Sequence, residues 1–165
     1  MSIYKTNHGH GPCPGLAGAR VKNPQQRLDD ILDILRQREL RITPQRVAIL
    51  RAFLHSEQHP SVEQVYSEVR SLFPTLSLAT VYKTVNLLKE LGEILEIGLT
   101  DGRNRYDGNK PYPHPHLICT GCNNIIDPEV SLLDQLTAEV AKATGYQITS
   151  HQVELFGLCP ACQPK

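Results

Sequence analysis

The sequence has no tryptophan. It also has no apolar run that approaches the roughly 20 residues needed by a membrane-spanning helix, so we expect no membrane span. The first residues, MSIYKTNHGHGPCPG, have no apolar segment behind their charges, so they do not look like a secretory signal. A cytoplasmic protein is expected, and in that compartment its five cysteines should not form stable disulfides.

The composition excludes several classes of protein. With 165 residues, the chain is long enough for one ordinary domain or two small ones, and too short for a large multidomain enzyme. Hydrophobic residues make up 40% and charged residues 21%, which is typical of a globular chain. The net charge is zero, but residues 1–110 carry 15 Lys and Arg against 12 Asp and Glu, whereas residues 111–165 carry 2 against 5. An anionic partner is therefore expected for the front part only.

The front part of the chain predicts four short helices after an irregular arm. Residues 1–22 are rich in glycine and proline without apolar periodicity, which indicates a flexible arm. Each expected helix follows a residue that commonly caps a helix N-terminus, and apolar side chains then recur on one helical face. The four caps are Asn23, Thr43, Ser61 and Ser77. Gly92 is expected to end the fourth helix.

A β-hairpin is expected directly after these helices. Residues 94–97 and 103–106 flank Thr100-Asp101-Gly102, whose chemistry suits a hairpin turn. Helices followed by a hairpin predict a winged helix-turn-helix domain, which we place at residues 23–108.

A second lobe is expected beyond a proline-rich hinge at residues 109–113. It spans residues 114–165 and should be a small α/β domain. Strands are expected at residues 116–120, 124–127 and 146–156, with a helix from Ser131 that Gly145 ends. The whole chain is thus expected to have an α+β fold.

The fourth expected helix carries polar side chains opposite its apolar stripe. On a 3.6-residue period, one face presents a small residue for close approach, Tyr and Lys for phosphate or base contacts, and Asn, which can pair with adenine. Arginines on the hairpin could reach the DNA backbone or the minor groove. For the helix alone, an ordinary solvated face is the simpler explanation, but the helices and hairpin together favour DNA binding. The candidate contacts are Ala79, Tyr82, Lys83, Asn86, Arg103 and Arg105.

Two C-x-x-C pairs follow expected strands of the second lobe. Their members are Cys119, Cys122, Cys159 and Cys162. Two such turns can complete a tetrahedral zinc shell that leaves no open position, so one structural zinc per subunit is expected. The alternative is a thiol oxidoreductase that uses one pair, but a thioredoxin-like pair requires a βαβ context. The fifth cysteine, Cys13, lies in the arm.

A second group of potential metal ligands surrounds the hinge. His114 and His116, two residues apart, lie on one side of an extended segment. Asp107 precedes them, Asp127 follows on the next expected strand, and His59 ends the second helix segment. Each has an ordinary structural explanation alone. If all five converge, their three nitrogens and two carboxylates suit iron(II) or manganese(II) and leave one open position. Such an ion would fix the angle between the lobes and thereby control DNA affinity.

These residues together resemble the ferric uptake regulator (Fur) family. The matching segments are residues 41–46, 59–60, 77–82, 105–107 and 114–119, and both C-x-x-C pairs. The resemblance implies a homodimeric winged-helix repressor, which is not an enzyme and binds A/T-rich inverted repeats in double-stranded DNA. It also implies a C-terminal α/β dimerisation domain, a four-cysteine structural zinc and a regulatory metal between the domains.

Within that family, the chain looks most like the peroxide-responsive (PerR) branch. The resemblance rests on Asp127, where iron-sensing members usually carry Glu, together with the other four candidate ligands. It implies that iron(II) at the regulatory site reacts with hydrogen peroxide, that His59 and His114 become oxidised, and that DNA is released. The alternative within the family is a repressor of iron or zinc homeostasis.

Overall fold

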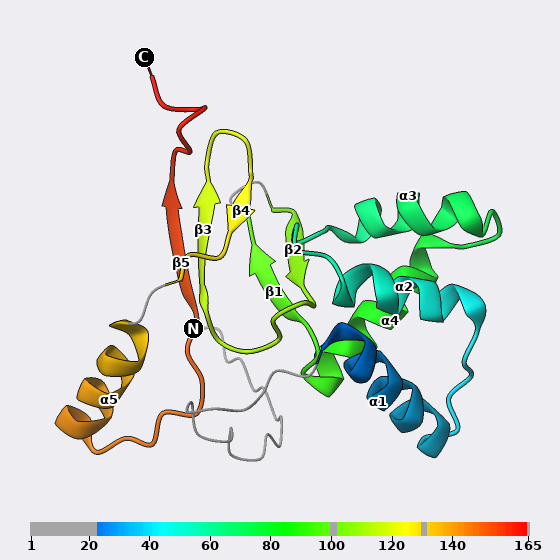
Figure 1. Cartoon of the computed structure of the whole chain (residues 1–165), viewed down its shortest axis with the longest axis horizontal. Helices are drawn as coiled ribbons and strands as arrows, with labels where there is room; N and C mark the ends of the chain where they lie inside the picture. The colour runs from blue at the N-terminus through cyan, green and yellow to red at the C-terminus, as the bar shows by residue number, and fades with distance from the viewer. Residues whose placement is uncertain (1–22, 100–101, 130–131, 165) are drawn as a thin grey trace, which may run out of the picture.

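The structure, a computed structural model, describes residues 23–99, 102–129 and 132–164. Four helices and a hairpin form the N-terminal half, and a three-stranded sheet with one helix forms the C-terminal half (Figure 1). The elements are α1 (Pro24–Gln37), α2 (Pro44–Leu54), α3 (Val62–Leu72), α4 (Leu78–Leu91), β1 (Leu95–Gly98), β2 (Asn104–Asp107), β3 (Pro115–Cys119), β4 (Ile125–Ile126), α5 (Leu132–Thr144) and β5 (Val153–Gly157). The fold is the expected α+β arrangement. The expected arm, with Cys13, lies outside the described residues, as do Thr100, Asp101 and Ser131.

The first four helices begin where the sequence predicts. Each expected cap accepts a hydrogen bond from a backbone N–H in the first turn of its helix, and at Asn23 and Ser61 a glutamine three residues on completes a capping box. Gly92 ends α4 in the left-handed conformation, with φ of 69°. The apolar faces of these helices bury one core, in which Ile31, Phe53 and Val81 have no exposed surface.

The hairpin lies one residue further along the chain than predicted. β1 and β2 are antiparallel, with Leu95 opposite Asp107 and Gly98 opposite Asn104. Tyr106 of β2 packs its ring edge-on against Phe53 of α2, which joins the hairpin to the helical core.

The C-terminal sheet has the strand order β4-β3-β5, with β3 antiparallel to β4 and parallel to β5. Its last strand is shorter than predicted, because it begins at Val153 rather than Tyr146. β3 is only five residues long and pairs with residues 153–157, so the preceding residues 146–152 reach no strand partner within the described chain. Apolar content alone therefore overstated this strand.

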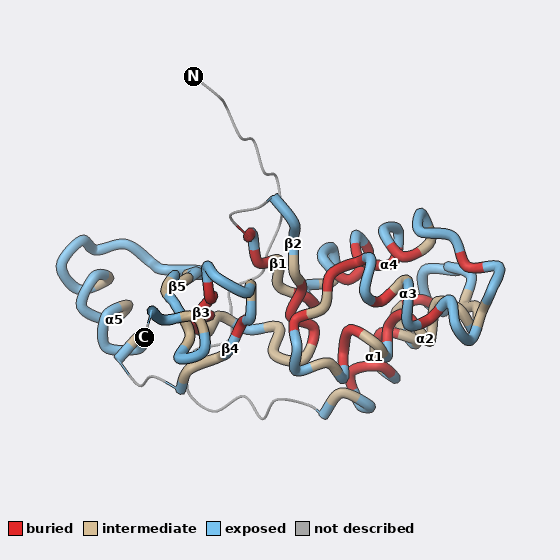
Figure 2. The backbone as a smooth tube through the Cα atoms, turned by 90° about the horizontal axis from the view of Figure 1, so that it is seen from above, coloured by how far each residue is buried: buried red, intermediate tan, exposed pale blue. Residues whose placement is uncertain are grey.

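The two halves contact each other through the hairpin. Ile97 and Leu99 form a buried cluster with Ile118 of β3 and Ile125 of β4. In contrast, α5 has no buried residue, and Figure 2 shows it exposed at the end remote from the four helices. None of the described helices is long and apolar enough to cross a membrane.

Candidate metal centres and nucleic-acid interface

The five predicted hinge residues come together from four separate segments. His59 lies in the loop between α2 and α3, and Asp107 is the last residue of β2. His114 and His116 lie just before and within β3, and Asp127 follows β4. One potential ligand atom from each residue lies within 4.8 Å of all the others. The cluster therefore spans the expected hinge at residues 109–113.

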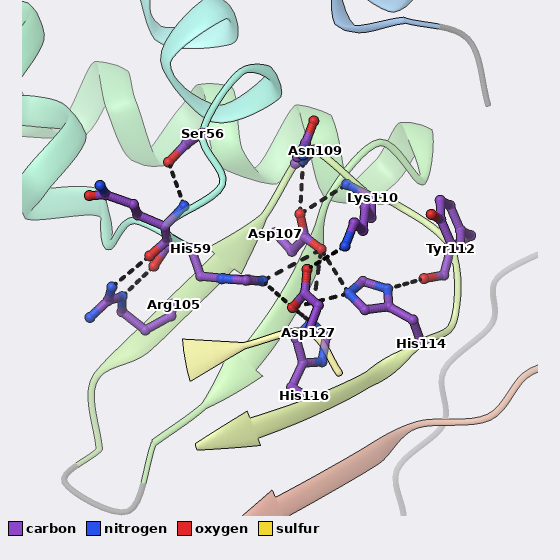
Figure 3. A network of polar contacts seen from close by, with 12 residues as sticks. Ser56, His59, Arg105, Asp107, Asn109, Lys110, Tyr112, His114, His116 and Asp127 are labelled. Atoms are coloured by element: carbon purple, nitrogen blue, oxygen red, sulfur yellow. Dashed lines mark hydrogen bonds and ion pairs between the residues drawn. The ribbon is translucent and has the colours of Figure 1, made fainter. Parts of the chain in front are cut away.

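Three imidazoles surround two carboxylate oxygens in this cluster (Figure 3). His59 Nε2 lies 2.9 Å from Asp127 Oδ1 and 3.7 Å from Asp107 Oδ2. His114 Nε2 lies 3.2 Å from Asp107 Oδ2 and 3.5 Å from Asp127 Oδ1. The corresponding distances from His116 Nε2 are 3.8 and 3.9 Å. All five side chains thus direct one atom toward a common centre.

The five inward atoms are buried and, among the described residues, they make only the ion pairs given above and no hydrogen bond. They are His59 Nε2, Asp107 Oδ2, His114 Nε2, His116 Nε2 and Asp127 Oδ1. Buried polar atoms without partners are costly, and each needs a physical explanation. A divalent cation would satisfy all five at once. A set of three imidazole nitrogens and two carboxylate oxygens fits iron(II) or manganese(II).

The electrostatics of the cluster also suit a cation. Burial lowers the pKa of His59, despite the opposing effect of Asp127 and Asp107, so its ring nitrogen remains available as a ligand. Burial alone would raise the pKa of Asp107, but the imidazoles of His114 and His116 and the Lys110 backbone N–H outweigh it and hold that pKa far below its usual range. Asp107 is therefore a fixed negative charge at the centre of the site.

Neighbouring groups hold the outer atoms of the ligands. Asp107 Oδ1 accepts hydrogen bonds from the backbone N–H groups of Asn109, at 2.8 Å, and Lys110, at 3.0 Å. The Lys110 ammonium lies 2.9 Å from Asp127 Oδ2, which leaves Oδ1 for the centre. His114 Nδ1 lies 2.8 Å from the Tyr112 carbonyl oxygen, which can only accept, so in the neutral imidazole Nε2 carries the lone pair that faces the site.

Two arginines bind the backbone next to ligands from the N-terminal half. Arg27 of α1 is buried and donates to the carbonyl oxygens of Gly108, at 2.7 Å, and Asn109, at 2.9 Å. Arg105 of β2 donates to the carbonyl oxygens of Gln58, at 2.9 Å, and His59. These bonds fix the chain directly after Asp107 and at His59.

Sequence reasoning did not identify Arg27 or Lys110 as parts of this site. Their partners are distant along the chain, so no local spacing signals the contacts. The sequence predicts a DNA contact for Arg105, and in the structure its guanidinium faces the His59 backbone. Alternation along a strand could not show which side of the hairpin the helices cover.

The four predicted zinc ligands also come together. One sulfur atom from each of Cys119, Cys122, Cys159 and Cys162 lies within 4.8 Å of the others. The Cys159 backbone N–H donates to Cys119 Sγ at 3.2 Å, and this bond, with the backbone N–H groups of Cys122 and Gly121, lowers the pKa of Cys119 to about 6. A Cβ atom on Gly121 would lie 2.9 Å from Cys162 Cβ, which shows how closely the two turns pack. Four convergent thiols fit one tetrahedral zinc better than a two-cysteine redox pair.

The predicted polar face of α4 is exposed. Ala79, Tyr82, Lys83 and Asn86 face solvent, while Val81, Val85 and Leu88 are buried. The Tyr82 hydroxyl donates to Glu63 Oε1 of α3 at 3.0 Å. Arg103 on the hairpin is exposed, and its charge helps to lower the pKa of Glu63, after the backbone hydrogen bond of Glu63 itself. The helix and hairpin therefore offer a polar surface on the N-terminal half.

Comparisons with known proteins agree with this architecture. A sequence model of the ferric uptake regulator family matches residues 37–156. The peroxide-responsive repressor PerR of Staphylococcus aureus is 33% identical over 145 residues, which cover 88% of this chain and 97% of that protein. The structure of the Campylobacter jejuni peroxide stress regulator is 32% identical, with a TM-score of 0.64, and the match covers 79% of this chain and 98% of the other. The Helicobacter pylori ferric uptake regulator has a TM-score of 0.79 over 90% of this chain and 99% of its own, but at 23% identity it supports the fold alone.

Proposed function

Because this chain belongs to the ferric uptake regulator family, we propose that it is a metal-dependent transcriptional repressor that releases DNA when hydrogen peroxide oxidises its regulatory site. Members of the family are transcriptional repressors rather than enzymes, bind DNA and act as dimers. Binding to a chromosomal operator would place the protein in the cytoplasm. The proposed operator is an A/T-rich inverted repeat, which matches the symmetry of a dimer.

The observation that carries the proposal is the cluster of five buried ligand atoms between the two halves, none of which makes a hydrogen bond among the described residues. Iron(II) or manganese(II) would be held by His59, Asp107, His114, His116 and Asp127. His59 and Asp107 belong to segments packed on the four helices, whereas the other three belong to the C-terminal half. Occupation of the site would therefore fix the orientation of the DNA-binding half.

The same residues provide a route for peroxide sensing. Iron(II) held by these residues would supply the redox chemistry that lets hydrogen peroxide oxidise a neighbouring imidazole, with no net change in the iron, whereas manganese(II) would supply it poorly. His59 and His114 are the proposed targets: a ring carbon gains one oxygen atom, and the other peroxide oxygen leaves as water. An oxidised imidazole is a poor ligand, so the metal would no longer link the two halves. The dimer would then release DNA.

The dimer interface is proposed to involve α5 and the strand region after it. Leu132, Leu136 and Val140 recur on one face of α5 and are 63%, 54% and 44% exposed. Tyr146 and Ile148 in the following segment are also exposed. A surface with this many exposed large apolar side chains is typical of an interaction site. A second copy would also offer residues 146–152 the strand partner that they do not have within the described chain.

The DNA interface is proposed to be the exposed face of α4 together with the hairpin. The α4 side chains Ala79, Tyr82, Lys83 and Asn86 would enter the major groove, and Arg103 would reach the backbone or the minor groove. One structural zinc per subunit, held by the four cysteines, would fix the C-terminus onto the sheet.

Mass spectrometry of the histidine peptides tests the sensing mechanism. Protein that already contains zinc is loaded with iron(II) or manganese(II), exposed to hydrogen peroxide and digested. We expect one added oxygen on the peptides of His59 or His114 in the iron form only. Cysteine oxidation without histidine oxidation would reject the mechanism and favour a metal-homeostasis repressor of the same family.

A further inference from the structure

Arg105 binds the backbone that carries His59, on the side opposite to the metal cluster. Its Nη2 donates to the Gln58 carbonyl oxygen at 2.9 Å, and its Nε donates to the His59 carbonyl oxygen. Figure 3 shows the guanidinium beside the His59 backbone, while the imidazole extends away from it toward Asp107 and Asp127. The planar fork of an arginine can bind two successive carbonyl groups in this way, whereas a lysine ammonium cannot reproduce the geometry.

The His59 backbone needs this support. Its φ is 48°, in the left-handed region that is strained for a residue with a side chain. The ring is held at one end only: His59 Nε2 lies 2.9 Å from Asp127 Oδ1, whereas Nδ1 has no hydrogen-bond partner among the described residues. Contacts of the backbone therefore contribute to holding this conformation.

Strand β2 supplies those contacts at three consecutive carbonyls. Arg105 binds the carbonyls of residues 58 and 59, and the Tyr106 backbone N–H donates to the Pro60 carbonyl at 3.1 Å. The next residue of the strand, Asp107, is itself a member of the cluster. The strand therefore places one candidate ligand directly and holds another through its backbone.

From this geometry, we propose that Arg105 is a positioning residue for the regulatory metal site rather than a DNA contact. It holds His59 in the conformation in which Nε2 faces Asp107 and Asp127. The proposal rests on the proposed metal-dependent function. It also assigns different roles to the two hairpin arginines. Arg103 remains the candidate DNA contact, whereas Arg105 affects DNA binding only through the metal.

Manganese binding and DNA binding in two arginine variants test this proposal. Manganese(II) is titrated into the zinc-loaded wild-type protein and into the variants R105K and R103M to measure manganese affinity. The affinity of each protein for an operator is then measured at saturating manganese. The operator is selected beforehand from random DNA duplexes. R105K keeps the charge but loses the fork, so its manganese affinity should fall about 10- to 100-fold, the usual cost of removing a group that orients a ligand. Its operator affinity at saturating manganese should equal that of wild type. R103M should bind manganese as wild type does, but it should bind the operator more weakly than wild type at saturating manganese.

The opposite result would overturn the proposal. If R105K binds manganese as wild type does, or if its operator affinity stays low at saturating manganese, Arg105 does not act through His59. Recovery of operator binding by excess manganese also shows that R105K is folded.

Arginine labelling provides a second readout that needs no variant. Phenylglyoxal is added to the metal-free wild-type protein and to its manganese-loaded operator complex, and labelled peptides are quantified. Arg105 should label slowly in both states, whereas Arg103 should label more slowly in the operator complex than in the protein without DNA. Fast labelling of Arg105 that the operator suppresses would contradict the proposal.

The two experiments distinguish failure of this inference from failure of the proposed function. Wild-type protein that binds its operator equally well with and without manganese would refute metal control, yet the labelling of Arg105 would still report whether its guanidinium is held by the backbone. If wild type requires manganese and R105K behaves like wild type, only the role of Arg105 is rejected.

Discussion

His59 Nε2 lies 2.9 Å from Asp127 Oδ1, although one residue precedes the expected hinge at residues 109–113 and the other follows it. The contact joins a loop of the helical half to the end of a strand in the other half. In the proposed function, a cation between these atoms replaces their direct contact by two ligand bonds. The metal would therefore connect the part of the chain that reads DNA to the part that dimerises.

The exposed face of α4 should determine operator binding. Lys83→Ala should weaken operator binding because a phosphate contact is lost. The slope of log affinity against log salt concentration should fall in magnitude by about one. Tyr82→Ala should weaken binding without lowering the melting temperature, because its side chain is 43% exposed. Lys89→Ala is a matched control on the same helix, since Lys89 pairs with Glu96. Gel-shift titration over a range of salt concentrations measures these effects, and unchanged binding by both Tyr82 and Lys83 variants would exclude α4 as the reading helix.

Loss of one zinc thiolate should destabilise the C-terminal half. Cys119→Ser should reduce bound zinc from one per subunit to near zero and lower the melting temperature, because structural zinc contributes an apparent binding free energy of about 10 to 16 kcal/mol in small peptides. Cys13→Ser should retain full zinc content and serves as the control. Metal analysis and thermal denaturation check this. A Cys119→Ser protein with normal zinc would disprove the four-cysteine site.

Gly108→Ala should disturb the site through the backbone. A Cβ atom there would lie 2.7 Å from the Phe53 carbonyl oxygen, and neither backbone can move easily, so a destabilisation of about 1 to 3 kcal/mol is expected. The adjacent Asp107 should shift with it and manganese affinity should fall. Gly98→Ala is the control, because its Cβ would meet no atom of the described residues within 4 Å. Urea denaturation and manganese titration test the pair, and equal behaviour of the two variants would contradict the close packing.

The hairpin should lose stability at high pH. Burial, followed by the nearby Glu96 carboxylate, raises the pKa of Tyr106 from 10.0 to about 12. Because the folded pKa lies above the unfolded value, the stabilisation is fully present below pH 10 and is lost as the pH rises toward 12. Absorbance titration of wild type against Tyr106→Phe should show one phenol ionising near pH 12. Ionisation of that phenol near pH 10 would refute the buried contact.

Much of the fold was predictable from local chemistry. The caps Asn23 and Ser61 and the helix-ending Gly92 act through neighbouring backbone groups, so their spacing carries the information. The two cysteines of each C-x-x-C pair lie in one turn, so their spacing also carries the information. The strand beginning at Val153 was placed too early, because pairing depends on the length of β3, which the local pattern does not contain.

The candidate site was predictable in its members but not in its supports. His114 and His116 share one side of an extended segment, and that periodicity is visible in the sequence. The positions of Lys110 beside Asp127 and of Arg105 behind His59 depend on how the hairpin packs on the helices, which no local spacing records. The sequence predicts a DNA contact for Arg105, but the bonds of its guanidinium to the carbonyl groups of Gln58 and His59 could not be predicted from its place on a hairpin.

Operator binding by the iron(II) and manganese(II) forms, each before and after hydrogen peroxide, tests the central claim most directly. We expect both metals to support binding, the metal-free protein to bind weakly, and peroxide to abolish binding by the iron form while the manganese form remains bound. Equal binding without metal, or equal loss from both metal forms after peroxide, would contradict the account.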